Sequence, residues 1–285
     1  MGTGIAAHIV TNSEDLRICW TNVTASSQFP VWSQTGVSGI DVYYRDAGTT
    51  SWKHLGVGEA QNAHDNVVNF DMGSSAPREF LIYLSSYRKL ALLRIETLSS
   101  ATLSAGPAPA HDPMVVLGSS IVQCGSTSRA GICWPHALGR ALDADTINLG
   151  FSGSCQLTLG MAQLMSTVDA SGYVIDCFPN MSVAQITAQL GPFINELYTA
   201  RPTVPIYVVG ARLRQYGGPS PYFLQLFQDQ ETAAINALPS LPTVTFISGA
   251  DLLGDDLEAL VDDSHPSDLG HWRQEQFLEP LIVLN

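Results

Sequence analysis

The chain contains two different patterns of apolar and polar residues. In its N-terminal part, short apolar runs alternate with glycine, asparagine, aspartate and serine, which favour turns. Short strands at even spacing predict a small antiparallel β-sandwich. The runs that predict its strands are residues 31–32, 40–44, 52–55, 67–70, 79–84 and 90–95.

Beyond residue 113, continuous apolar runs alternate with helix-like segments. Apolar strands that alternate with helices predict a parallel sheet covered by helices on both faces, which is an α/β fold. We expect the last helix to begin after Ser267, whose hydroxyl can cap it. The expected strands are residues 114–117, 146–149, 173–177, 206–209 and 244–247, and the expected helices are 134–142, 159–168, 183–200, 222–238 and 268–281.

A stretch rich in proline and small residues separates the two patterns. Residues 104–113 read Ser-Ala-Gly-Pro-Ala-Pro-Ala-His-Asp-Pro and show no apolar periodicity, which is typical of a linker between domains. We therefore expect a jelly-roll-like β-sandwich domain over residues 1–105, a linker over 106–113 and an α/β domain over 114–285.

Composition and charge exclude several classes of protein. Apolar residues make up 45% of the chain and charged residues 14%, which fits a folded globular protein rather than a disordered one. The net charge of −13 would repel nucleic acid and anionic lipid surfaces, which bind lysine and arginine. No apolar run reaches the ~20 residues that cross a bilayer. Residues 1–10 do not resemble a signal peptide, and the compartment stays open.

The cysteines and acidic residues do not predict a metal site. The five cysteines show no Cys-x-x-Cys spacing, and their low, odd number is not that of a disulfide framework, although one bridge is possible. The acidic residues between 251 and 263 lack the spacing of a calcium-binding loop. We expect no metal and no cofactor. The cysteines are Cys19, Cys124, Cys133, Cys155 and Cys177.

Candidate chemistry gathers after the predicted strands, where parallel sheets bind their ligands. The first strand of the α/β domain runs into Gly118 and Ser120, so the serine is either a nucleophile on a tight turn or an ordinary turn residue. Gly153 follows the second strand, and its N–H either faces a developing oxyanion or belongs to a plain turn. Asn180 follows the third strand and either donates its amide to an oxyanion or caps the helix expected at residue 183.

The best candidate for a general base is His265. Asp262 precedes it by three residues, so its carboxylate can accept the ring Nδ1–H when both lie on one loop. That hydrogen bond leaves Nε2 free to take a proton. The alternative is a surface turn followed by a helix cap. We expect no catalytic role for the other histidines, which are His8, His54 and His64 in the sandwich, His111 in the linker, and His136 and His271 in helices.

In this order, the four segments resemble the four sequence blocks of the SGNH, or GDSL, hydrolases. The sequence Gly118-Ser119-Ser120 is similar to the Gly-Asp-Ser of the first block, and Gly153 and Asn180 match the residues that name the second and third. The segment from Asp262 to His265 fits the Asp-x-x-His of the fourth block.

The N-terminal part also resembles a known signature. Residues 39–43, Gly-Ile-Asp-Val-Tyr, are close to the Gly-x-Asp-Leu-Tyr that names a subgroup with an N-terminal β-sandwich. The resemblance thus covers nearly the whole chain. It implies a three-layer, flavodoxin-like SGNH hydrolase domain with a central parallel sheet, preceded by a small antiparallel β-sandwich.

The resemblance implies a role for each matched residue. Ser120 attacks an ester carbonyl, His265 accepts the serine proton, and Asp262 orients the imidazole. The Ser120 N–H, the Gly153 N–H and the Asn180 side chain form the oxyanion hole.

The chain departs from the family pattern at two points. Ser119 replaces the usual aspartate and is a rival nucleophile, and the third block reads Pro-Asn-Met rather than Gly-x-Asn-Asp. Four aromatic residues are candidates for the pocket wall: Trp134, Phe178, Tyr216 and Phe223.

The motifs and the resemblance together favour a serine carboxylester hydrolase. The resemblance implies that it removes small acyl groups, acetyl above all, from a small-molecule or carbohydrate ester. Two alternatives stay open. One is a lysophospholipase or thioesterase, and the other is a glycan-binding protein whose hydrolase part is inactive. The sandwich could bind substrate, shape the cleft or support a homo-oligomer.

Overall fold

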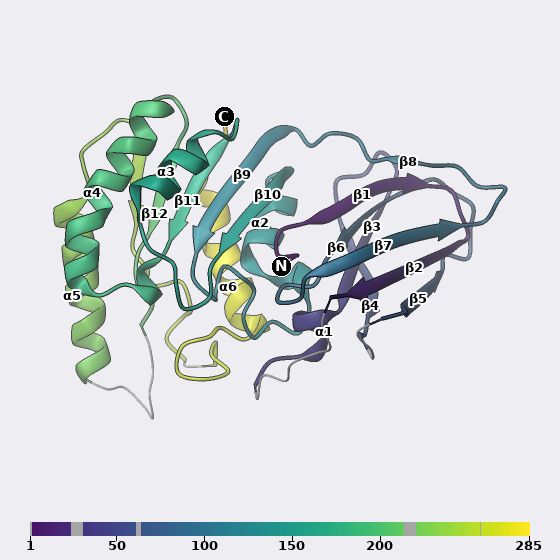
Figure 1. Cartoon of the computed structure of the whole chain (residues 1–285), viewed down its shortest axis with the longest axis horizontal. Coiled ribbons are helices and arrows are strands. Elements are labelled where there is room, and N and C mark those ends of the chain that lie inside the picture. Colours follow the sequence, from purple (N-terminus) through teal and green to yellow (C-terminus); the bar gives the residue numbers. More distant parts are fainter. Residues whose placement is uncertain (1, 24–30, 61–63, 214–220, 257) are drawn as a thin grey trace. The chain divides into compact units, whose positions relative to one another are not determined.

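The computed structural model describes residues 2–23, 31–60, 64–213, 221–256 and 258–285 (Figure 1). The chain forms two compact units, which we call the N-terminal and the C-terminal unit. The N-terminal unit comprises Met1–Ala108 and Thr127–Cys133. The C-terminal unit comprises Pro109–Ser126 and Trp134–Asn285. The division therefore falls inside the expected linker, and seven residues of the later sequence, 127–133, belong to the N-terminal unit.

The N-terminal unit is the predicted antiparallel β-sandwich. One sheet has the order β4-β3-β6-β1-β8 and the other has the order β5-β2-β7. Trp20, Phe80 and Ile82 are among the buried side chains from the two sheets that form one core. The strands are β1 (Ala6–Thr11), β2 (Asp15–Asn22), β3 (Ile40–Asp46), β4 (Lys53–Gly58), β5 (Asn66–Asp71), β6 (Arg78–Tyr83), β7 (Leu90–Thr97) and β8 (Leu103–Ala105).

The structure differs from the predicted strands in this unit at several places. Residues 31–32 form a turn and not a strand, and Val31 is half exposed. A short helix, α1 (Gln34–Ser38), follows and is capped by the Ser33 hydroxyl. The sequence pattern did not single out β1, β2 or β8. In β2, the exposed charged residues Asp15 and Arg17 lie on the face opposite Leu16, Ile18 and Trp20, which face the core.

Asp41 of the Gly-x-Asp-Leu-Tyr-like signature lies in β3 and is almost fully buried. Its carboxylate accepts hydrogen bonds from Arg129 Nη1 at 2.9 Å and from the Gly131 N–H at 2.8 Å, and His54 Nε2 lies 3.0 Å away. A Cβ atom at Gly131 would lie 2.4 Å from the Tyr43 ring, so only glycine fits there. The signature aspartate therefore holds residues 127–133 within the N-terminal unit.

The C-terminal unit is built on a parallel sheet. Its strand order is β10-β9-β11-β12-β13, the flavodoxin-like arrangement in which the first strand lies between the second and third. Helices α3, α4 and α5 share a core with one face, and α2 and α6 share a core with the other (Figure 1). The strands are β9 (His111–Gly118), β10 (Ala144–Gly150), β11 (Gly172–Asp176), β12 (Ile206–Val209) and β13 (Val244–Ile247). The helices are α2 (Trp134–Ala141), α3 (Leu159–Ser166), α4 (Val183–Ala200), α5 (Pro221–Ala237) and α6 (Asp268–Leu278), with short 3₁₀ helices η2 (Phe178–Asn180) and η3 (Glu279–Leu281). A third 3₁₀ helix, η1 (Ala130–Ile132), belongs to the N-terminal unit.

The α/β fold class is confirmed, and most predicted elements are found with small shifts. The bounds of β12, β13 and α4 agree with the sequence prediction. Strand β9 begins at His111, inside the stretch expected as linker, because His111 pairs beside Ala144 of β10. Within the described part of the chain, no helix is both long and apolar enough to cross a membrane.

Candidate active site

Ser120 lies on a sharp turn at the carboxyl end of β9. The Gln123 N–H donates to the Ser119 carbonyl at 3.0 Å, and the Gly125 N–H donates to the Ser120 carbonyl at 2.7 Å. A Cβ atom at Gly118 would lie 2.1 Å from Val122, so the turn requires glycine at its start. The turn places Ser120 just beyond the carboxyl end of β9, where the sequence predicted it.

A chain of two hydrogen bonds joins the three predicted triad residues. Ser120 Oγ lies 2.8 Å from His265 Nε2, and His265 Nδ1 lies 2.8 Å from Asp262 Oδ2. Ser120 and His265 are 145 residues apart in the sequence, so the fold brings them together. This is the arrangement of a nucleophile, a base and an orienting carboxylate.

The Asp262 carboxylate is held by its own loop. Its Oδ1 accepts the backbone N–H groups of Ser264 at 2.8 Å and His265 at 2.7 Å. Partial burial acts to raise the pKa of Asp262, but the hydrogen bonds from the His265 backbone and ring and from Ser264 outweigh it and lower the pKa. Asp262 is therefore ionised at neutral pH, and its carboxylate can only accept hydrogen bonds. His265 Nδ1 then carries the ring proton, and Nε2 presents a lone pair to the Ser120 hydroxyl.

Ser119, the rival nucleophile, has a different environment. Its side chain has no solvent exposure, and its hydroxyl oxygen accepts the Ile121 N–H at 3.2 Å. Ser120 retains 8% exposure and contacts the imidazole. The geometry therefore favours Ser120 over Ser119.

Gly153 lies on an exposed turn between β10 and α3. Its φ of +70° is left-handed, which glycine adopts without strain. Two hydrogen bonds tie this turn to the Ser120 turn: the Ser152 N–H donates to Gln123 Oε1 at 2.8 Å, and the Phe151 N–H donates to the Gly118 carbonyl at 2.7 Å. Among the described residues, no acceptor is paired with the Gly153 N–H.

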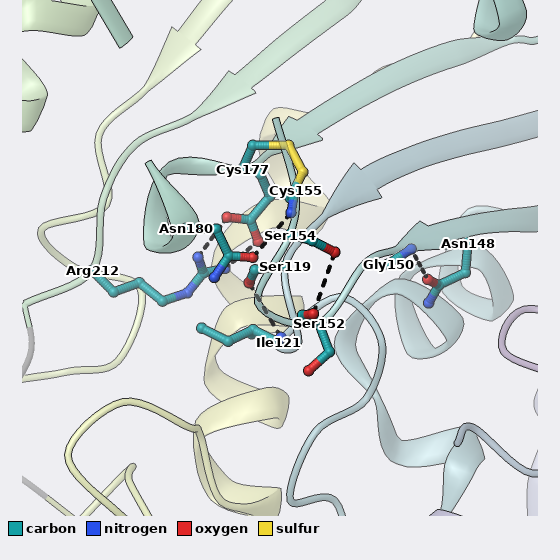
Figure 2. Close-up of a disulfide and its surroundings, with 11 residues drawn as sticks. Ser119, Ile121, Asn148, Gly150, Ser152, Ser154, Cys155, Cys177, Asn180 and Arg212 are labelled. Carbon is teal, nitrogen blue, oxygen red and sulfur yellow. Dashed lines mark hydrogen bonds and ion pairs between the residues drawn. A yellow bond between two sulfur atoms is a disulfide. The ribbon is translucent and has the colours of Figure 1, made fainter. Parts of the chain in front are cut away.

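Asn180 ends the 3₁₀ helix η2, and its amide is oriented by the neighbouring loop. Its Oδ1 accepts the Cys155 N–H at 3.3 Å (Figure 2). Nδ2 has no acceptor in the part of the chain that the structure describes. The alternative role as a helix cap is wrong, because Ser182 and Gln185 form the capping box of α4. Among the residues that the structure describes, the Asn180 N–H₂ group is therefore open to another acceptor.

Two of the aromatic residues expected in the pocket wall do not reach a surface. Trp134 and Phe178 are fully buried in the two cores of the C-terminal unit, so that expectation was wrong for them. Phe223, on α5, is partly exposed, and its place in the wall stays a prediction. Tyr216 lies outside the described residues.

The cysteines form more bridges than the sequence suggested. Cys155 is bonded to Cys177, and this disulfide joins the Gly153 loop to the residue that follows β11 (Figure 2). Cys124 and Cys133 are also disulfide-bonded, and only Cys19 is free. All five cysteines are described. The sequence could not reveal these pairs, because 22 residues separate Cys155 from Cys177.

A buried ion pair lies beside the same bridge. Asp176, the last residue of β11, binds Arg212 through two hydrogen bonds of 2.6 and 2.7 Å. Arg212 Nε also donates to Gln274 Oε1 at 2.7 Å, and the Asp176 carbonyl accepts the Ser119 N–H at 3.3 Å. The pair therefore links the ends of two strands to the Ser120 turn. Sequence reasoning missed it, since Arg212 lies outside every sequence block.

Sequence reasoning also missed the part that His271 plays beside the Ser120 turn. The Trp134 N–H donates to His271 Nδ1 at 3.3 Å, so Nε2 carries the proton and donates to the Gly125 carbonyl at 3.4 Å. Complete burial lowers the pKa of His271 to about 3. The imidazole is therefore neutral and supports the turn that begins at Ser120.

The buried His271 should make the protein sensitive to acid. Its folded-state pKa of about 3 lies below the ordinary value of 6.5, so the unfolded chain binds a proton first as the pH falls. We expect this residue alone to remove about 3 kcal/mol from the free energy of unfolding between pH 7 and pH 4. Urea denaturation at both pH values measures the loss. The His271→Gln variant keeps a hydrogen-bond acceptor and a donor but does not titrate. Its free energy of unfolding should therefore fall by about 3 kcal/mol less than that of the wild type between the two pH values. An equal decrease in both proteins would contradict the prediction.

Families of known proteins match both parts of the chain. Residues 111–283 match the GDSL-like lipase/acylhydrolase family. The chain belongs to this family. Residues 1–103 match the N-terminal domain of SGNH-hydrolase-type esterases. The resemblance seen in the sequence is confirmed, and the protein is a serine esterase of the SGNH type.

Solved structures share the fold over both units. A protein from Bacteroides ovatus, described as a GDSL-like lipase, is 30% identical, with a TM-score of 0.90 over 98% of this chain and 84% of its own. A salicylyl-acyltransferase from a tetracycline biosynthetic pathway is 17% identical, with a TM-score of 0.77 over 96% and 80%. A family two carbohydrate esterase from Clostridium thermocellum, in complex with cellohexaose, is 15% identical, with a TM-score of 0.71 over 98% and 92%. No curated protein matches the sequence.

Proposed function

We propose that this esterase removes small acyl groups, above all acetyl, from carbohydrate esters through an acyl-enzyme on Ser120. The observation that carries the proposal is the hydrogen-bonded chain from Ser120 Oγ through His265 to Asp262, with both distances at 2.8 Å. Three side chains in this order make a hydroxyl nucleophilic at neutral pH.

In the first half of the reaction, Ser120 Oγ attacks the ester carbonyl carbon while His265 Nε2 takes the hydroxyl proton. The imidazolium that forms is stabilised by the Asp262 carboxylate. The tetrahedral intermediate then collapses: the bond to the alkoxy oxygen breaks, and His265 returns its proton to the leaving alcohol. In the second half, water attacks the acyl-enzyme with the same base, and the carboxylic acid and free Ser120 are released.

The oxyanion is bound by donors from three segments. We assign the Ser120 N–H, the Gly153 N–H and Asn180 Nδ2 to this role. The support for Asn180 is the hydrogen bond in which its Oδ1 accepts the Cys155 N–H, because this bond leaves Nδ2 to donate to another acceptor. A preorganised donor stabilises the charge of the transition state more than it stabilises the neutral ester.

Replacing Asn180 by alanine should lower kcat about 10²- to 10³-fold and leave KM close to its wild-type value. The donor meets full negative charge only in the transition state, so the loss appears in kcat. Steady-state hydrolysis of p-nitrophenyl acetate gives both constants. Ser182→Ala, which removes the cap of α4, is the matched control and should keep the wild-type kcat. A rise in KM with an unchanged kcat would show that Asn180 binds the ground state instead.

The carbohydrate part of the proposal is supported by the fold shared with carbohydrate esterases and by an N-terminal β-sandwich present in this chain. Small acyl groups are the expectation that came with the family resemblance. The substrate is thus proposed as a class, an acetylated sugar with a free alcohol as the leaving group.

A series of p-nitrophenyl esters from acetate to long acyl chains tests the acyl size. We expect the highest kcat/KM for acetate and release of acetate from acetylated oligosaccharides. A maximum at long chains, or preferential cleavage of lysophospholipids or acyl-thioesters, would contradict the proposal in favour of a lipid or thioester hydrolase. Failure of Ser120 to react with a fluorophosphonate would indicate a binding protein without a working site.

A further inference from the structure

The Cys155–Cys177 disulfide lies between the two segments that supply the oxyanion donors other than Ser120. Cys155 follows Gly153 by two residues, and Cys177 precedes Asn180 by three. Both cysteines are buried, with 1% and 0% exposure, and their Cα atoms are 5.3 Å apart (Figure 2). The bridge therefore links the Gly153 turn directly to the end of β11.

Two hydrogen bonds reinforce the same link. The Cys155 N–H donates to Asn180 Oδ1 at 3.3 Å, and the Asn180 N–H donates to the Cys177 carbonyl at 3.0 Å. Cys155 thus contacts the side chain of Asn180, and Cys177 contacts the backbone of Asn180. A shift of Cys155 would move the group that holds the Asn180 amide in its present orientation.

The Gly153 turn depends on its two ends for its position. The residues from Phe151 to Ser154 are exposed and pack against no core cluster. At the entry, hydrogen bonds to Gln123 and Gly118 hold the turn to the Ser120 segment. At the exit, the side chain of Cys155 is the first that enters a core, and it does so as part of the disulfide.

From this arrangement we infer that the Cys155–Cys177 disulfide positions the oxyanion hole. It fixes the Gly153 N–H and Asn180 Nδ2 relative to each other, so that both meet the same oxygen atom in the transition state. The inference rests on the proposed function of these two donors. The cysteines touch no reacting atom, so they are positioning residues.

Removing the bridge should lower kcat and leave KM nearly unchanged. Donors that are displaced by about 1 Å lose much of their effect on the transition state, and a misplacement of this size can cost about 10²-fold. Part of the geometry survives through the hydrogen bonds, so we expect a decrease in kcat of about 10- to 100-fold. A bridge that served the stability of the fold alone would leave kcat as it is in the folded protein.

The test compares Cys155→Ala/Cys177→Ala with the wild type and with Cys19→Ala, at a temperature where circular dichroism shows each variant folded. Cys19 is the free cysteine, in the N-terminal unit, so its variant should keep the wild-type kcat. If the double alanine variant does not fold, Cys155→Val/Cys177→Ala refills the buried volume without restoring the bridge. A kcat within twofold of the wild type in a folded variant would overturn the inference.

A double-mutant cycle with Asn180→Ala shows whether the bridge acts through the oxyanion hole. Loss of the bridge should reduce kcat clearly less in the Asn180→Ala background than in the wild type, because one of the two positioned donors is already absent. An equal fold decrease in kcat in both backgrounds would show that the bridge acts elsewhere and would overturn the inference. Absence of esterase activity in the wild type would contradict the proposed function instead, so the two failures are distinguishable.

Discussion

Ser120→Ala should abolish turnover, with kcat for p-nitrophenyl acetate lower by about 10⁴- to 10⁶-fold. Without the hydroxyl, no acyl-enzyme can form, and only the oxyanion donors and binding remain to accelerate attack by water. The variant should also lose covalent labelling by a fluorophosphonate, which mass spectrometry of the intact protein measures. Ser120 has 8% exposure and packs in no core cluster, so the fold should survive.

Ser119→Ala is the matched control for this experiment. The Ser119 hydroxyl is buried and accepts the Ile121 N–H, while the Ser120 hydroxyl contacts the imidazole. We therefore expect Ser119→Ala to keep its fluorophosphonate labelling and most of its activity. Retained activity in Ser120→Ala together with loss in Ser119→Ala would reverse the assignment of the nucleophile.

The parts of the fold that the sequence predicted best are those with strong local patterns. Strand β12 is a continuous apolar run, β13 is apolar except for Thr245, and α4 begins with the capping box of Ser182 and Gln185, so their bounds follow from neighbouring residues. Strand β2 was not predicted, because its alternation is short: exposed Asp15 and Arg17 alternate with buried Leu16 and Ile18, but the next two residues, 19 and 20, are both buried. Its core side chains are identified only by the sheet they pack against.

The candidate site divides in the same way. Ser120, Gly153, Asn180 and the Asp262–His265 pair stand in recognisable blocks at the ends of predicted strands and in the last loop, so sequence reasoning could name them. The sequence did not identify the groups that position these residues. The partner of Cys155, the ion pair of Asp176 with Arg212 and the two contacts of His271 all join residues far apart in the chain. Such pairs depend on tertiary packing, which no local pattern records.

Asp262→Asn should lower kcat by about 10⁴-fold while leaving the protein folded. In the wild type, one carboxylate oxygen accepts two backbone N–H groups, from Ser264 and His265, and the other accepts the His265 ring proton. The two backbone donors require an acceptor, so the side-chain carbonyl oxygen of the asparagine should face them. Its N–H₂ group then faces His265 Nδ1.

An N–H₂ group beside Nδ1 reverses the tautomer of the imidazole. Nδ1 must accept a hydrogen bond from this group, so the ring proton moves to Nε2, which lies 2.8 Å from Ser120 Oγ. A protonated Nε2 has no lone pair with which to remove the serine proton, and the nucleophile is no longer activated even though every heavy atom stays near its place. Asp263→Asn changes the same charge on the neighbouring residue and should keep kcat within about twofold. Similar kinetics for the two variants would show that the lost charge, and not the tautomer of His265, controls the rate.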